Sequence, residues 1–404
     1  MPPRKRHRTC APAPTPELPA NLVLEILTRS DAATIFRCAA TCKPLRRAIL
    51  SPDFIRRVTQ GPDDAAVVPS RVLGVLGDSE ASFSLVHPIT VASLTFADHH
   101  LAPFMSLSAA GLLEEYAPLA SRRGLVVLGR RETNRRRRPS DLLQVQTRYV
   151  LLTAADGIGG CAGGFMLLAA YMSRNLDCSL RIRVQTVSSP EPDGGEWGAV
   201  KTSDHQCPWW CMRLDSYDHD DAVVLGGVVH WLMHAGAGFL ESDAGGASEY
   251  ILTYDVNTAT VGSIDLPYGY QHAGHCAILE GSGSSSQLAS SPDGKLSLIV
   301  VDHQATVSIW VLSSGGGSCW VRHWEVDMVA EWDFFHSWGV RALQSASFGD
   351  QRTGVVFLRI GGAQGRLCGV DMEDKTTFLN FFEEKTGIPC EVDLASRLSS
   401  MKAY

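Results

Sequence analysis

The sequence lacks three features, and each absence excludes a large class of proteins. No uninterrupted apolar run reaches the roughly 18 residues of a membrane-spanning helix, and the best stretch, 165–172, is too short. The first residues are basic and lack the apolar segment of a secretory signal. The formal net charge is −7, whereas a general nucleic-acid binder needs a cationic surface. We therefore expect a cytoplasmic or nuclear chain that binds neither membrane nor nucleic acid.

A disulfide framework and a clear metal motif are also missing. The 11 cysteines are scattered and odd in number, so we interpret most of them as reduced, buried side chains in a reducing compartment. The group His205, Cys207, Cys211 and His219 has the residue types of a zinc site but not the tight paired spacing of a structural one. We favour a strand edge or a binding surface there, and we expect no metal and no other cofactor.

Charge is distributed unevenly along a chain that has ample material for a core. Of the 404 residues, 45% are hydrophobic and 20% are charged, which suits two or three globular domains. Residues 1–58 carry 11 Lys and Arg against 4 Asp and Glu, whereas the remainder carries 25 against 39. A basic head joined to an acidic body indicates two units with different partners.

The head divides into a tail, a helical segment and a linker. Residues 1–16 are basic and then rich in proline, so we expect disorder; the run Arg4–Arg8 suits either a nuclear-import signal or a solvated tail. Residues 17–58 have the spacing of three or four short helices, because apolar residues recur every four positions. Residues 59–75 contain several Gly, Pro and Asp residues and are interpreted as a linker.

Within the helical segment, Leu18, Leu22 and Ile26 form one apolar stripe. Ser30 or Asp31 is expected to cap a second helix, and Pro44 fits the first turn of a third. So small a unit buries too little surface to be stable alone.

Residues 76–404 show the pattern of strands without intervening helices. Gly226–Pro267 and Gly294–Val326 each hold a loose unit of successive strands and turns, which suits blades of a β-propeller. The segment Leu107–Leu119 is expected to hold a short helix, and 291–294 a turn. The fold class is thus α+β multidomain, a small all-α unit followed by an all-β, propeller-like domain. The expected strands are Gly124–Leu128, Tyr149–Thr153, Ala222–Leu225, Val228–Leu232, Tyr250–Val256, Leu296–Val301, Val307–Leu312 and Val355–Ile360.

The helical segment opens with Leu18-Pro19, continues to Glu25-Ile26-Leu27, has Arg37-Cys38 before Cys42-Lys43, and ends in Ser51-Pro52-Asp53-Phe54. In this it resembles an F-box, whose family pattern is Leu-Pro, Glu-Ile-Leu, Arg-Cys before Cys-Lys, and Ser-Pro-x-Phe. The residues that occupy these places are Leu18, Pro19, Leu22, Glu25, Ile26, Leu27, Arg37, Cys38, Cys42, Lys43, Ile49, Pro52 and Phe54. Two positions depart from the pattern and bear on adaptor affinity: Leu45 stands where the family usually has Trp, and Ser30-Asp31 where it has Leu-Pro.

The resemblance implies a subunit of an SCF-type ubiquitin ligase that does no covalent chemistry itself. An F-box binds a Skp-type adaptor and, through it, a cullin. The residues that would bind the adaptor are Leu18, Pro19, Leu22, Ile26, Leu27, Cys42, Leu45 and Ile49. A basic F-box would also be attracted to an acidic adaptor.

The C-terminal region resembles the F-box-associated, propeller-like regions of plant F-box proteins. The phrases that carry this likeness are Gly227–Trp231, Tyr250–Asp255 and Ile309–Leu312. The likeness implies a receptor domain that binds a target protein, and neither the target nor the residues that bind it can be named from the sequence.

Two other functions stay open. The first is a non-degradative scaffold, in which the apolar stripe packs on the chain's own β region. The second is a nucleotide-dependent enzyme, because the loop Gly157–Gly160 between two apolar segments has the glycines of a dinucleotide-binding site, with Asp177 near the place of a ribose ligand. We favour a glycine-rich hairpin, because the following strands do not alternate with helices. The run Arg135–Arg138 is interpreted as a solvated loop.

Overall fold

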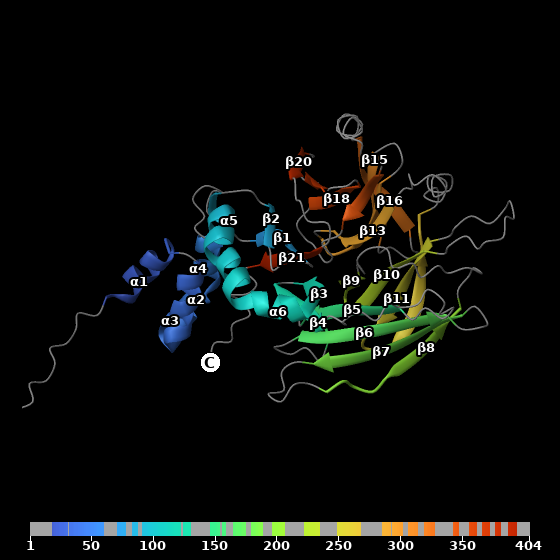
Figure 1. The fold of residues 1–404 in the computed structure, drawn as a ribbon, viewed down its shortest axis with the longest axis horizontal. Coiled ribbons are helices and arrows are strands. Elements are labelled where there is room, and N and C mark those ends of the chain that lie inside the picture. The colour runs from blue at the N-terminus through green and yellow to red at the C-terminus, as the bar shows by residue number, and fades with distance from the viewer. Residues whose placement is uncertain are drawn as a thin grey trace, which may run out of the picture. The chain divides into compact units, whose positions relative to one another are not determined.

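The chain divides into two compact units. The helical unit comprises Met1–Ser70, Thr90–Phe96 and Leu394–Tyr404, and the β unit comprises Arg71–Ile89 and Ala97–Asp393 (Figure 1). No described helix is long and apolar enough to cross a membrane. The computed structural model describes residues 18–30, 32–59, 71–77, 83–87, 91–122, 124–130, 146–153, 156–158, 165–174, 179–188, 196–206, 222–234, 249–267, 285–291, 293–301, 306–313, 319–327, 342–346, 355–361, 366–371, 376–380 and 387–393.

The helical unit contains the short helices that the apolar spacing predicts. Five helices lie within its described residues: α1 (Ala20–Leu27), α2 (Ala32–Thr41), α3 (Lys43–Ile49), α4 (Pro52–Thr59) and α5 (Val91–Phe96). Pro44 lies in the first turn of α3, as expected. α5 was not expected from the sequence, and it belongs to this unit although the start of the β unit precedes it in the chain.

The described strands of the β unit form antiparallel sheets, which confirms the expected all-β region after a small helical unit. Among the described residues, four sheets have four strands each, and each follows chain order. The first two are β5 (Gln146–Thr153), β6 (Phe165–Arg174), β7 (Leu180–Ser188) and β8 (Lys201–His205), then β9 (Ala222–Leu225), β10 (Val228–His234), β11 (Glu249–Asp255) and β12 (Thr260–Asp265). The other two are β13 (Ser285–Ser290), β14 (Leu296–Val301), β15 (Thr306–Ser313) and β16 (Cys319–Asp327), then β17 (Ala342–Ala346), β18 (Val355–Gly361), β19 (Arg366–Asp371) and β20 (Thr376–Asn380).

Two smaller sheets complete the β unit, and one of them joins its beginning to its end. The strands are β1 (Arg71–Gly77), β2 (Phe83–His87), β3 (Tyr116–Arg122), β4 (Leu125–Arg130) and β21 (Gly387–Asp393). β1 pairs with β2 on one side and with β21 along its whole length on the other. β1 begins at Arg71, so the segment 59–75, expected to be a linker, ends in a strand. Every strand named from the sequence overlaps an observed one, and both repeat units fall within single sheets.

The sheets pack on one another through apolar faces. The core between β5–β8 and β9–β12 includes Leu168, Trp231 and Tyr254, which are almost fully buried. The next core lies between β9–β12 and β13–β16 and includes Ile251 and Leu298. First strands of successive sheets also lie together, because β3 contacts β5, β9 contacts β13 and β13 contacts β17.

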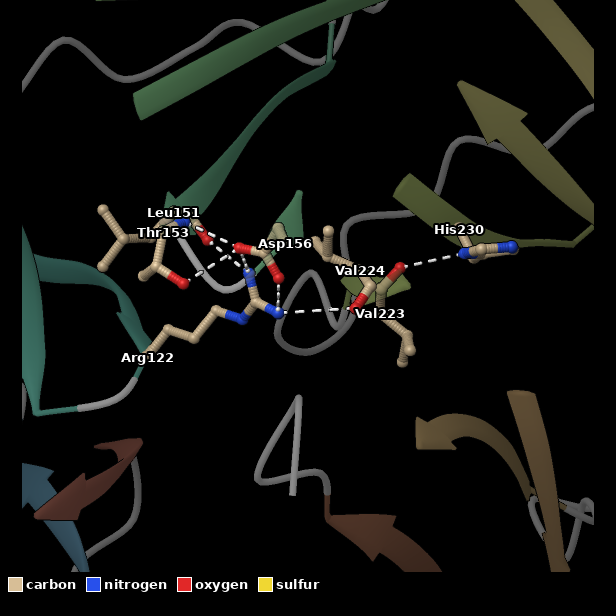
Figure 2. Close-up of polar contacts among 7 residues, drawn as sticks. All are labelled: Arg122, Leu151, Thr153, Asp156, Val223, Val224 and His230. Carbon is tan, nitrogen blue, oxygen red and sulfur yellow. Dashed lines mark hydrogen bonds and ion pairs between the residues drawn. The ribbon is translucent and has the colours of Figure 1, made fainter. Parts of the chain in front are cut away.

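A buried ion pair links three of these sheets near their first strands (Figure 2). Arg122, at the end of β3, donates both terminal nitrogens to Asp156, with Nη1–Oδ2 at 2.7 Å and Nη2–Oδ1 at 2.8 Å. Arg122 also donates to the carbonyls of Leu151 on β5 and Val224 on β9. Asp156 in turn accepts bonds from the backbone N–H and hydroxyl of Thr153. The pair therefore satisfies its own charges while it fixes β3, β5 and β9 together.

His230 on β10 is a second buried polar side chain, which Figure 2 shows directed at the carbonyl of Val223. Its Nδ1 lies 3.1 Å from that oxygen. A carbonyl only accepts, so Nδ1 carries the proton in the neutral ring. Burial lowers the pKa of His230, against the opposing effect of hydrogen bonds with the backbone of Val223 and Val228.

We expect the buried imidazole to make stability depend on pH. An unfolded histidine titrates near its ordinary pKa of about 6.5, whereas the pKa of His230 in the folded chain is lower. Between these two pKa values the unfolded chain holds the proton and the folded chain does not. The stabilisation of the folded state by the neutral ring is therefore fully present above about pH 6.5 and is lost as the pH falls. Replacement His230→Asn keeps a donor near the Nδ1 position and removes the titration. The free energy of unfolding, measured with urea at about pH 7 and about pH 5, should fall less between these pH values in the variant than in the wild type. An equal fall in the two proteins would contradict a neutral buried ring.

Candidate functional site

The candidate site is an apolar ridge formed by α1 and the residues just before it, which the helical unit leaves exposed. Leu18 is 62% exposed, Leu22 48% and Ile26 55%. Leu22 and Ile26 are four residues apart and share one face of α1, and Leu18 precedes the first helical residue by two positions; these three residues are called the ridge below. Large exposed apolar stripes mark sites where another molecule binds.

The backbone around Pro19 fixes where α1 begins. Pro19 precedes the first helical residue with φ −54° and ψ 138°, and its carbonyl accepts bonds from the N–H groups of Leu22 and Val23. Proline suits this place because a helix start needs no N–H from it. Pro19 is itself exposed, next to Leu18.

Side-chain hydroxyls satisfy carbonyls at the end of α1. Thr28 donates its hydroxyl to the carbonyl of Glu25 at 2.8 Å, and Ser30 donates to that of Ile26 at 2.9 Å. Ser30 was one of two residues expected to cap α2, and that expectation stays a prediction, because a hydroxyl that donates to one group can still accept from an N–H. Asp31, the other, lies outside the described residues.

Glu25 ties α1 to α4 on the face beside the ridge. Its two carboxylate oxygens accept from Arg29 at 3.0 Å and from Arg57 at 2.7 Å. The Arg57 contact spans 32 positions of sequence, so it orients α1 relative to α4 rather than only supporting one helix. Both pairs are partly exposed and contribute little free energy each, but they hold the ridge at a defined angle to the unit's core.

The helical unit has an apolar core formed by residues of α1 to α4. Leu27, Ile35, Ala39 and Ile49 are at most 3% exposed, and Phe54 and Val58 are buried with them. Ser51 caps α4 by accepting the N–H of Phe54. Arg46 on α3 donates to the carbonyl of Ala39 at 2.8 Å, which joins α3 to α2.

The structure separates the residues expected to bind an adaptor into two groups. Leu18, Pro19, Leu22, Ile26 and Cys42 are exposed, and Leu45 is half-buried. Leu27 and Ile49 are buried in the core of the helical unit, so their side chains are not accessible to a partner. Glu25 and Arg57 were not expected as a pair, because nothing in the sequence relates positions so far apart.

The surface of the helical unit is basic. Among its described residues, Arg29, Arg37, Lys43, Arg47, Arg56 and Arg57 are exposed, whereas Glu25 and Asp53 are the acidic ones. Arg56 pairs with Asp53 at 3.4 Å and Glu25 pairs with two arginines, so the unit keeps a net positive charge. A partner with an apolar groove flanked by acidic residues would be complementary to this surface.

The other candidate sites gain no support from their surroundings. The segment around Gly157 joins β5 to β6, and these strands pair antiparallel, with Thr153 opposite Phe165. A dinucleotide fold needs a helix there, so the dinucleotide-binding alternative is wrong and the hairpin interpretation holds. Cys207, Cys211, His219 and Arg135–Arg138 lie outside the described residues, and within those residues no group of three potential metal ligands occurs.

The comparison with known families decides the assignment of the larger part of the chain. Residues 89–404 match the family described as a domain of unknown function (DUF7595). The chain belongs to the DUF7595 family. Residues 16–57 of this DUF7595 chain match the F-box domain, which confirms the F-box and places it within one residue of the expected segment 17–58. No curated protein matches the chain.

Solved structures share only a distant likeness with this DUF7595 chain. Two mutants of the apocarotenoid oxygenase of Synechocystis align at 12% and 13% identity, over 59% of this chain and 50% of theirs, with TM-scores of 0.34. A chimera of that oxygenase with RPE65 aligns at 11% identity over the same shares, with a TM-score of 0.33. The chain thus spans about half the length of these proteins, and a likeness at this level establishes neither a fold nor an activity.

Proposed function

We propose that the chain is the substrate-recognition subunit of an SCF-type ubiquitin ligase. In this proposal the F-box binds a Skp-type adaptor and, through it, a cullin, while the β unit binds a target protein. The chain makes and breaks no covalent bond; it raises the concentration of the target near the ubiquitin-carrying enzyme. Such a ligase would work in the cytoplasm or nucleus.

The exposed ridge is the observation that carries the proposal. Burial of Leu18, Leu22 and Ile26 in a partner's cleft would contribute about 1.5–3 kcal/mol each before ordering costs. The competing scaffold function requires the ridge to be packed against the chain's own β region, and within the helical unit itself the ridge is left uncovered. Helices with a single apolar stripe characteristically bind in apolar grooves of partners.

The topology of the β unit supports a receptor role. We infer that its four-stranded meanders are blades of a propeller, with the pairing of β1 and β21 closing the ring. The order of strands, the contacts between successive first strands and the lateral packing of adjacent sheets all suit this arrangement. Loops at the ends of such blades provide a broad surface for a protein target.

The experiment for this function uses the full chain and a purified Skp-type adaptor. Size-exclusion chromatography with light scattering should show a complex of one chain with one adaptor at micromolar concentration. Addition of a cullin should then shift the complex to a larger mass. Separate elution of chain and adaptor at these concentrations would reject the ligase function and leave the scaffold function.

A further inference from the structure

The helical segment at the start of the β unit is apolar on two opposite faces. It comprises η1 (Ala97–Leu101) and η2 (Phe104–Ala109), two wide π-helical turns, followed by α6 (Ala110–Glu115). The sequence predicted a helix within 107–119, but the helix ends at Glu115 and β3 begins at the next residue. Figure 1 shows α6 leading into β3 and β4.

One of the two faces is buried and accounts for the position of the segment. Met105, Ala109 and Leu113 recur every four residues and are each 7% exposed. They pack with Leu76 of β1 and Cys390 of β21, the strands that join the two ends of the β unit. This face therefore anchors the segment over the β1–β21 pair.

The second face is exposed to solvent over much of its apolar surface. Phe104 is 56% exposed, Leu107 84% and Leu112 53%, and Gly111 lies between the leucines. Phe104 and Leu107 lie on η2, and Gly111 and Leu112 lie on α6; these four exposed residues are together called the outer stripe. A surface helix ordinarily turns polar side chains to solvent, so an apolar outer stripe indicates a surface kept for binding.

Charge around the outer stripe identifies the chemistry of what binds. Glu114 and Glu115 follow Gly111 by three and four positions, which places them beside the stripe, and both are exposed. Asp98 is exposed on η1, and residues 97–115 contain no Lys or Arg. A complementary partner carries apolar side chains flanked by basic ones.

We propose that the outer stripe is a docking surface for an amphipathic, basic segment of another protein. That this protein is the ligase target rests on the proposed function, whereas the surface and its preference for basic, apolar segments do not. The surface is separate from the ridge, which belongs to the helical unit and is surrounded by basic residues.

The test uses the full chain and two synthetic peptides that share one helical stripe of leucines. The polar positions are all Lys in one peptide and all Glu in the other. Fluorescence anisotropy should show at least a tenfold tighter complex with the Lys peptide, and this preference should shrink in Glu114→Gln/Glu115→Gln. Equal affinity for both peptides, or no binding of the Lys peptide, would overturn the proposal.

Two single variants locate the binding. Leu107→Asp places a charge at the most exposed leucine, and Gly111→Arg adds a basic side chain where a Cβ would meet no atom within 4 Å. Each substitution should weaken binding of the Lys peptide at least tenfold. Arginine is a better helix former than glycine, so the fold should persist in Gly111→Arg. Val321→Asp, at an exposed apolar position on β16, is the matched control and should bind as wild type does. Unchanged affinity in both test variants would place the binding elsewhere and reject the surface.

Two further measurements separate this proposal from binding by the chain's own basic tail and from the proposed function. Binding of the Lys peptide that occurs only after deletion of residues 1–16 would show that the chain's own basic tail is the occupant, which overturns the claim of a foreign partner. Adaptor binding by Leu107→Asp should equal that of wild type. If neither the wild type nor Leu107→Asp binds the adaptor, the proposed function fails. The peptide measurements still test whether the outer stripe is a docking surface.

Discussion

Replacement of Asp156 with alanine should lower the free energy of unfolding by about 3–5 kcal/mol, the usual cost of leaving a buried charge without its partner. The Arg122 side chain is 8% exposed and that of Asp156 is 3% exposed. Without the carboxylate, the guanidinium would lose both of its short bonds to Asp156, and the backbone N–H of Thr153 would lose its acceptor. Urea unfolding of the full chain, followed by tryptophan fluorescence, measures the loss.

An exposed ion pair in the same unit provides the control. Arg181 and Asp204 bridge β7 and β8 at 2.9 Å, with side chains 46% and 49% exposed. Asp204→Ala should therefore cost at most about 1 kcal/mol. The double replacement Arg122→Met/Asp156→Leu removes both charges and should recover much of the loss seen with Asp156→Ala. Equal losses in Asp156→Ala and Asp204→Ala would contradict the linking role of the buried pair.

Replacement of both Leu22 and Ile26 with lysine should weaken adaptor binding at least about 100-fold, because two apolar contacts of about 1.5–3 kcal/mol each are lost. The added positive charges do not oppose an acidic partner, so the loss must come from desolvated lysines in an apolar cleft. Both positions are exposed, so the helical unit should stay folded. Titration calorimetry against the purified adaptor measures the change.

Leu94 on α5 gives the matched control for the ridge. It is also an exposed leucine of the helical unit, but it lies outside the F-box. Leu94→Lys should leave adaptor affinity within about twofold of wild type, since a surface substitution away from the interface changes little. A similar loss in Leu94→Lys and in Leu22→Lys/Ile26→Lys would mean that general charge, rather than the ridge, determines binding.

The features that depend on local periodicity could be predicted from the sequence. Leu18, Leu22 and Ile26 are a local pattern, and so are the strand runs such as Ala222–Leu225 and Leu296–Val301, whose bounds agree with β9 and β14. Turn chemistry was also readable, because Gly294 adopts φ +76° in the segment 291–294. Local signals of this kind require no knowledge of which segments meet.

The features that depend on distant contacts could not be predicted. Arg122 and Asp156 are 34 positions apart, and no local pattern relates an arginine at the end of one strand to an aspartate next to the loop Gly157–Gly160. Pairing of β1 with β21 joins a strand near the beginning of the chain to one near its end. The division of the apolar residues of the F-box into an exposed ridge and buried Leu27 and Ile49 follows from how α1 packs on α3, which periodicity alone does not state.

Amide hydrogen exchange of the full chain, with and without the Skp-type adaptor, tests most directly whether the ridge is the adaptor-binding surface. Slower exchange is expected on adaptor binding in peptides that cover α1 and the start of α3, with no change in peptides from β9–β12. Protection that spares α1, or that appears mainly in the β unit, would contradict the account.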